Sequence, residues 1–119
     1  MRIRAATLAG LACLPAMSAA AQTPSPGKWV LSRASEWPDI CKVTLTREPG
    51  IGGSQVRLAG NCAKLAKWTT DIAAWRPDKG KGVVFADATR KTLIFLGPLD
   101  DGDFIGPGPD GIDYVLSKE

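Results

Sequence analysis

Residues 40–46 read ICKVTLT and form the clearest alternation of apolar and polar side chains in the chain. Cys41, Val43 and Leu45 fall on one side of the pattern, and the residues between them fall on the other. A period of two is typical of a β-strand with one face buried and one face exposed. We therefore predict a half-buried strand whose apolar face contributes to the core.

Short apolar runs recur on both sides of this strand, separated by turns rich in Gly, Pro and Asp. The run at 92–97 is apolar throughout, which predicts burial on both faces or a barrel wall with a covered exterior. In the run at 111–117, the alternation places Ile112 on the same face as Tyr114 and Leu116. The predicted strands are residues 28–33, 40–46, 54–59, 72–76, 82–87, 92–97, 103–106 and 111–117.

One stretch departs from the strand pattern. Asn61 can cap a short helical turn over residues 62–68, in which Leu65 and Trp68 share a face. About eight short strands with tight turns favour an up-and-down antiparallel β-barrel or a β-sandwich. The sequence therefore predicts a small all-β domain with one short helical turn.

Residues 1–21 have the three-part pattern of a secretory signal peptide. Arg2 and Arg4 make a basic start, an apolar run follows over residues 5–16, and small residues come directly before the cleavage site. The apolar run is too short to span a bilayer, which needs about 20 residues. Removing these 21 of the 119 residues would leave a mature chain of 98.

A second interpretation of this segment is a lipoprotein signal. Residues 10–13 read GLAC, which is similar to a bacterial lipobox with Cys13 as the lipidated residue. Ordinary cleavage after Ala21 predicts a periplasmic protein, whereas lipidation predicts an outer-membrane lipoprotein. A membrane is therefore expected as a partner only if Cys13 carries lipid.

The three cysteines fit an exported protein. Cys13 leaves with the signal or carries lipid, so Cys41 and Cys62 remain as a pair. Disulfides persist in oxidising compartments. A bond closing the 20 residues between these two would stabilise the fold by about 3 kcal/mol in the chain-entropy model. Two free buried cysteines are the alternative.

The charge balance argues against nucleic acid as a partner. The chain carries 15 basic and 12 acidic residues, a net charge of +3 that falls to +1 without Arg2 and Arg4. No basic stripe stands out, so no electrostatic footprint for nucleic acid is present. We expect a monomer.

The residue types exclude most catalytic chemistry. The chain has no His, which removes the usual general base, the usual nucleophilic triad and most zinc sites. Asp100, Asp101 and Asp103 cluster around a Gly and are interpreted as a solvated turn. We expect no enzyme activity, no metal site and no cofactor.

The chain has four tryptophans, and Trp is common at binding hot spots. Trp29 and Trp75 belong to strand patterns and Trp68 to the helical face, so these three are predicted to lie in the core. Trp37, beside Pro38 in a polar connection, is the one candidate for an exposed contact.

Five segments carry a resemblance to a known family. They are GKWVLS at 27–32, CKVTL at 41–45, VRLAGNC at 56–62, WRP at 75–77 and GIDYVL at 111–116. In this order they resemble the Inh-type inhibitors of serralysin-type zinc metalloproteases, and the related outer-membrane lipoproteins that share the inhibitor domain. The similarity covers about residues 27–117.

This resemblance implies an eight-stranded antiparallel barrel over residues 27–119, with a disulfide between Cys41 and Cys62. It also implies that the residues before the barrel form a lead that enters the cleft of a secreted metalloprotease, with the terminal amine approaching the zinc. The barrel would brace the lead. In this chain the lead is Gln22, Thr23, Pro24, Ser25 and Pro26.

The lead is about half as long as in those inhibitors, and cleavage after Ala16 or Ala20 would lengthen it. Its two X-Pro bonds fix φ and stiffen it, which favours insertion into a cleft or a semi-rigid spacer. The spacer would suit a structural or interaction module of the envelope.

A small-ligand binder of the lipocalin type is a further alternative, because Gly27 and Trp29 match the Gly-x-Trp that opens lipocalin barrels. Against it, large side chains would fill a small eight-stranded interior. The side chains expected to point inward are Trp29, Leu31, Val43, Leu45, Phe85 and Phe95.

Overall fold

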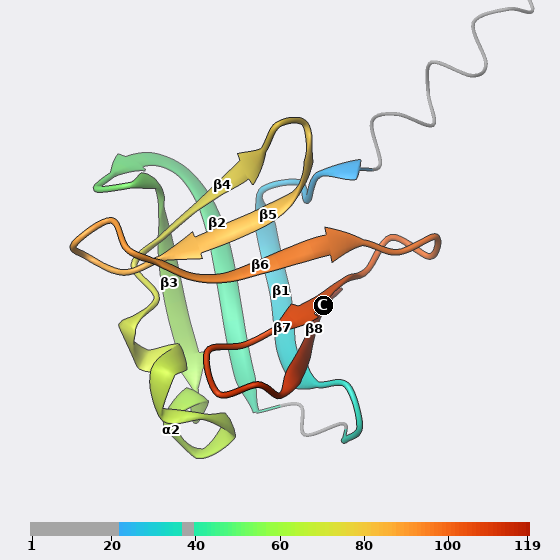
Figure 1. Cartoon of the computed structure of the whole chain (residues 1–119). Helices are drawn as coiled ribbons and strands as arrows, with labels where there is room; N and C mark the ends of the chain where they lie inside the picture. The colour runs from blue at the N-terminus through green and yellow to red at the C-terminus, as the bar shows by residue number, and fades with distance from the viewer. Residues whose placement is uncertain (1–21, 37–39) are drawn as a thin grey trace, which may run out of the picture.

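The computed structural model describes residues 22–36 and 40–119, which form a closed β-barrel (Figure 1). Each strand is antiparallel to the next in the sequence, and β8 pairs with β1 to close the wall. The structure confirms the all-β class and selects the barrel over the sandwich. The strands are β1 (Gly27–Arg33), β2 (Cys41–Gly50), β3 (Gly53–Gly60), β4 (Ala74–Asp78), β5 (Lys81–Ala86), β6 (Thr92–Pro98), β7 (Phe104–Pro107) and β8 (Asp113–Lys118).

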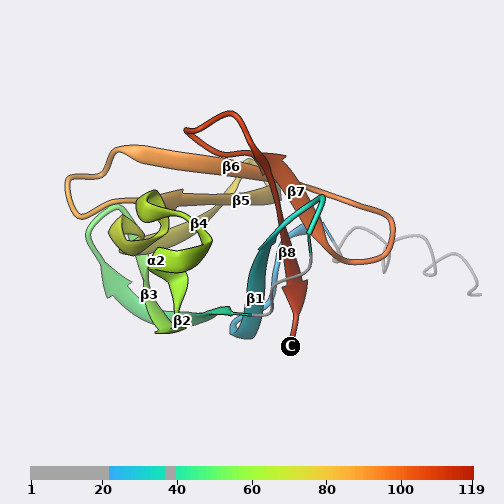
Figure 2. The same ribbon diagram turned by 90° about the horizontal axis from the view of Figure 1, so that it is seen from below.

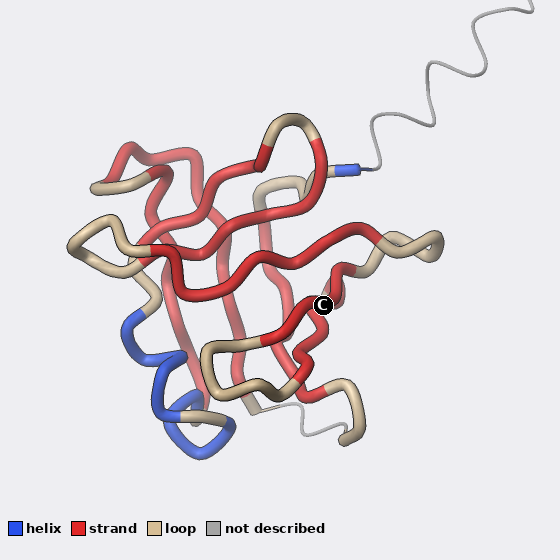
Figure 3. The backbone as a smooth tube through the Cα atoms, in the orientation of Figure 1, coloured by secondary structure: helices blue, strands red, loops and turns tan. Residues whose placement is uncertain are grey.

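Two short helical segments connect β3 to β4 and cover one end of the barrel (Figure 3). They are α2 (Cys62–Leu65) and the 3₁₀ helix η3 (Lys67–Asp71). The Asn61 side chain accepts a hydrogen bond from the backbone N–H of Lys64, as predicted for a cap. None of the described helices is long and apolar enough to cross a lipid bilayer.

A disulfide joins Cys41 at the start of β2 to Cys62 at the start of α2, as predicted. It fixes the helical segment to the barrel wall. Beside it, Leu65 is buried and Trp68 packs against the core, as predicted. The predicted single turn over residues 62–68 is wrong, because Ala66 is extended and separates α2 from η3.

The interior of the barrel is packed with buried side chains from seven of the eight strands, and β3 adds the partly buried Val56 and Leu58. Tyr114, Phe85 and Phe104 are the largest of the fully buried residues. Interior-facing residues alternate with exterior ones along each strand, so both sides of the barrel contribute to one core. The core cluster is Trp29, Leu31, Cys41, Val43, Leu45, Cys62, Leu65, Ile72, Trp75, Val83, Phe85, Ile94, Leu96, Phe104, Tyr114 and Leu116.

Phe95 corrects two sequence-based expectations. Ile94 and Leu96 are buried, but Phe95 between them points outward and is 41% exposed. The predicted covered exterior and the predicted inward direction of Phe95 are therefore wrong. The physical reason is strand parity, because neighbours of an inward residue must face outward. The Phe95 ring packs over Gly82 and Gly97, where a Cβ would come within 3.0 and 3.6 Å of it.

Three strand boundaries also differ from the sequence pattern, and the largest difference is that β2 continues to Gly50 instead of ending at Thr46. Ile112 lies before β8 in a turn, where its N–H donates to Asp110 Oδ1, and its side chain is exposed rather than grouped with Tyr114. Strand β4 begins at Ala74, two residues late, because the N–H of Ile72 bonds to Thr69 O at the end of η3.

Candidate functional site

The lead, residues 22–26, is docked on the end of the barrel where β1 begins and β8 ends, here named the lead end (Figure 1). Pro24 is buried and Gln22 is exposed. The Trp29 indole Nε1 donates a hydrogen bond of 2.9 Å to the Ser25 carbonyl oxygen. The Lys118 ammonium donates to the Ser25 hydroxyl at 3.2 Å. Ser25 is therefore held by two neighbouring strands.

Trp29 occupies a fixed position at this end. Its side chain is only 3% exposed, and its ring meets the Phe104 ring edge-on at 5.8 Å between centroids. In the β1–β8 ladder Trp29 lies directly opposite Lys118, whose ammonium is 5.6 Å from the Trp29 ring. A cation at this distance from an indole face is attracted to it.

The loop between β6 and β7, residues 99–103, lies beside the lead in both views (Figures 1 and 2). The backbone N–H of Leu99 bonds to Asp103 O at 2.8 Å, and the N–H of Asp103 bonds to Asp101 Oδ1 at 2.9 Å. Leu99 nevertheless exposes 40% of its surface. The lead end thus presents Gln22 and an apolar side chain on a well-bonded turn.

The opposite end of the barrel holds a polar cluster around Tyr114. The Tyr114 hydroxyl donates to Asp110 Oδ2 at 2.7 Å, and the Trp68 ring stands perpendicular to the Tyr114 ring at 5.0 Å. Burial, together with the Asp110 carboxylate, raises the pKa of Tyr114. Burial alone would also raise the pKa of Asp110, but the hydrogen bonds from Tyr114 and Ile112 outweigh it and lower that pKa.

These opposite shifts decide what the Tyr114 cluster can do. Near neutral pH the tyrosine stays protonated and the carboxylate stays ionised, so neither group is poised for general acid–base catalysis. Two buried nitrogens nearby, Arg33 Nε and Trp68 Nε1, have no hydrogen-bond partner within the described part of the chain. They border a shallow surface hollow lined by Arg33, Ala66, Lys67, Trp68, Pro109 and Asp110.

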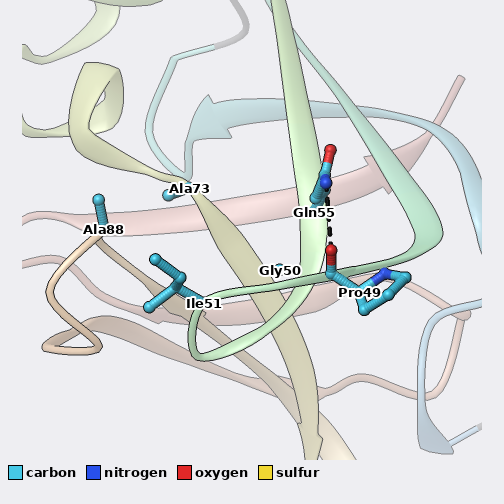
Figure 4. Close-up of a pocket in the computed structure, with 6 residues that line it drawn as sticks. All are labelled: Pro49, Gly50, Ile51, Gln55, Ala73 and Ala88. Carbon is cyan, nitrogen blue, oxygen red and sulfur yellow. Dashed lines mark hydrogen bonds between the residues drawn. The ribbon is translucent and has the colours of Figure 1, made fainter.

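A second hollow lies at the β2–β3 hairpin (Figure 4). In it the Gln55 side chain donates to Pro49 O at 3.1 Å, and Ile51 is 55% exposed. No lining side chain is charged or nucleophilic, so the hollow offers no catalytic chemistry. Its lining residues are Pro49, Gly50, Ile51, Gln55, Ala73 and Ala88.

Within residues 22–36 and 40–119, no group of three or more His, Cys, Asp or Glu side chains could hold a metal ion. Of the residues singled out in the sequence, the lead residues and the disulfide lie at opposite ends of the barrel. Trp37 and Cys13 lie outside the described residues. Lys118 was missed, because its spacing from Ser25 becomes meaningful only once β8 pairs with β1.

The sequence comparison decides the family. The model of the family described as Protease inhibitor Inh matches residues 20–118, which include the lead and the whole barrel. The chain belongs to the Inh protease inhibitor family. The resemblance of the five segments is thereby confirmed, and membership implies a protease as partner.

Two relatives of this Inh family member agree with that assignment. A curated protein of Pseudomonas aeruginosa, named as a proteinase inhibitor, is 31% identical over 93 residues, covering 77% of this chain and 70% of the relative. The crystal structure of a psychrophilic marine protease MP inhibitor superposes with a TM-score of 0.60 at 18% identity, covering 86% of this chain and 99% of that one. At that identity the structural likeness shows the shared fold.

Proposed function

We propose that this Inh family member inhibits a secreted zinc metalloprotease of the serralysin type. The lead, residues 22–26, enters the protease cleft and its terminal amine approaches the zinc. The barrel rests on the rim of the cleft and braces the lead. Inhibition takes place in the periplasm.

The observation that carries this proposal is the docked lead. Ser25 is fixed to β1 and β8, while Gln22 at the tip is exposed. Pro24 and Pro26 on either side of Ser25 have a restricted φ. A segment already ordered in this way loses less conformational entropy when it enters a cleft.

The length of the free tip sets the geometry of the complex. If cleavage follows Ala21, only Gln22 and Thr23 extend beyond the docked Pro24, a span of about 7 Å in extended chain. Such a short tip reaches a metal only if the lead end of the barrel sits directly against the cleft. Cleavage after Ala16 or Ala20 would relax that requirement.

The packed interior argues against the lipocalin-type alternative. Trp29, Phe85, Phe104 and Tyr114 fill the centre of the barrel and are nearly or fully buried. The two hollows described above open onto the outside of the barrel. A ligand inside the wall would have to displace these rings.

The test removes the free tip and leaves the docked part in place. Deleting Gln22 and Thr23 from the mature protein should raise the inhibition constant against a serralysin-type protease by at least about tenfold. Thermal unfolding should stay unchanged, since the Ser25 contacts remain. An unchanged inhibition constant would overturn the insertion mechanism, and inhibition of serine proteases alone would overturn the metalloprotease target.

The proposed compartment has a separate test. Mass spectrometry of the native N-terminus, combined with cell fractionation, should find a free amine at Gln22 in the periplasmic fraction. A lipidated Cys13 in the outer-membrane fraction would instead show that the protein is an outer-membrane lipoprotein.

A further inference from the structure

We infer that Trp29 and Lys118 are positioning residues that form a clamp on Ser25 and set the direction in which the lead leaves the barrel. This inference rests on the proposed insertion of the lead. It assigns to two barrel residues, one from each strand of the β1–β8 seam, a role in potency that needs no contact with the protease.

The first half of the clamp is the Trp29 indole. Its N–H donates to the backbone carbonyl of Ser25, so it holds the main chain and does not depend on the Ser25 side chain. The ring cannot turn away easily, because it is buried and packed edge-on against Phe104. A rigid donor therefore fixes the height of Ser25 above the barrel end.

The second half is the Lys118 ammonium, which approaches Ser25 from the neighbouring strand. It donates to the hydroxyl of Ser25 and also lies against the Trp29 ring. The Ser25 carbonyl and hydroxyl are thus held from two directions. With Pro24 buried beside them, these two points of attachment fix the orientation of Ser25 more tightly than either one alone.

The flanking prolines pass this orientation on to the tip. Pro24 and Pro26 have a fixed φ, and each also restricts the residue before it, namely Thr23 and Ser25. Little rotational freedom remains between the clamp and Thr23. The clamp therefore sets the direction of the tip. Without the clamp the lead would be more mobile, and the conformational entropy lost when the protease binds it would reduce the affinity.

The chain offers a matched control for the indole. Trp75 is also buried, and its Nε1 donates to the backbone carbonyl of Thr46 at 2.8 Å, away from Ser25. Trp29→Phe and Trp75→Phe each keep an aromatic ring and remove one N–H bonded to a backbone carbonyl. Both should lower the melting temperature by similar amounts, but only Trp29→Phe should weaken inhibition, by about tenfold.

The ammonium has a control in the same wall. Lys118→Met keeps the aliphatic stem and removes the donor to Ser25, whereas Lys42→Met removes an ion pair with Glu119 at 3.1 Å. Lys118→Met should raise the inhibition constant several-fold, and Lys42→Met should leave it unchanged. The inhibition constant of the Trp29→Phe, Lys118→Met double variant should be at least as high as that of the weaker-binding single variant.

A measurement without protease keeps the inference separable from the proposed function. Backbone ¹⁵N relaxation should report Ser25 as ordered as the strands in the wild type and mobile in the double variant. Wild-type order at Ser25 in the double variant overturns the clamp. If deleting Gln22 and Thr23 weakens inhibition but Trp29→Phe and Trp75→Phe have the same inhibition constant, the clamp has no role in potency and the insertion mechanism stands. If that deletion has no effect, insertion itself is wrong.

Discussion

Cys41, the first residue of β2, is bonded to Cys62, the first residue of α2, across 21 positions of sequence. The whole β2–β3 hairpin lies between them, so the bond closes a loop that contains two strands of the wall. Cys41 is fully buried, which protects the bond from solvent.

Replacing both cysteines by Ala should lower the free energy of unfolding by about 3 kcal/mol, the value expected for closing a loop of this size. Urea denaturation of the oxidised wild type and the double variant would measure the difference. The reduced wild type is the control and should resemble the variant. Equal midpoints for all three would contradict the prediction.

Gly60 tests how closely the chain passes the β2 strand at the disulfide. Gly60 and Gly80 share the same φ of +81°, but a Cβ on Gly60 would overlap the Ile40 carbonyl oxygen, while one on Gly80 meets nothing within 4 Å. Gly80→Ala should cost about 1–2 kcal/mol from the left-handed backbone alone. Gly60→Ala should cost clearly more in chemical denaturation, and equal losses would contradict the contact.

The Tyr114–Asp110 contact predicts a dependence of stability on acidity. The folded-state pKa of Asp110 is lowered, so its contribution is complete above the unfolded pKa of about 3.9 and is lost as pH falls through the lower folded value. Between about pH 4 and pH 2, Asp110→Asn should lose stability less steeply than the wild type. Tyr114→Phe should also flatten the slope, because it removes a donor to the carboxylate. The check is the melting temperature as a function of pH, and equal slopes for the wild type and both variants would contradict this prediction.

Leu99 tests the bracing role proposed for the barrel. Leu99 and Ile51 are both exposed at hairpin turns. The β6–β7 loop that carries Leu99 lies beside the lead, whereas the β2–β3 hairpin that carries Ile51 lies on the other side of the barrel (Figures 1 and 2). Leu99→Glu should weaken inhibition by about tenfold or more, because a charge would enter a desolvated contact. Ile51→Glu should have no effect on the inhibition constant. Equal effects from both would show that the lead end does not meet the protease.

Much of the barrel could be predicted because its strands are half buried. In β2 the alternation of Cys41, Val43 and Leu45 gives the buried face directly. The helical cap at Asn61 and the pairing of Cys41 with Cys62 also follow from local residue types and the number of cysteines. Closure of the wall came from family resemblance, since alternation alone also fits a sandwich.

The errors arise where the pattern lacks contrast. Every residue from Leu93 to Leu96 is apolar, so parity could not show that Phe95 points outward over Gly82 and Gly97. Ile112 fits the alternation of β8 but belongs to a turn, which depends on its bond to Asp110. The bond from Lys118 to Ser25 was equally hidden, because it joins residues 93 positions apart.

The β1–β8 seam makes docking of the lead depend on closure of the barrel wall. Seven of the eight strand pairings join neighbours in sequence, and only this one joins the two ends of the barrel. Ser25 is held by one residue from each side of the seam, so a chain whose wall is still open has no place to dock its lead. Under the proposed insertion mechanism, an incompletely folded molecule is a weak inhibitor, and full potency reports that the last pairing has formed.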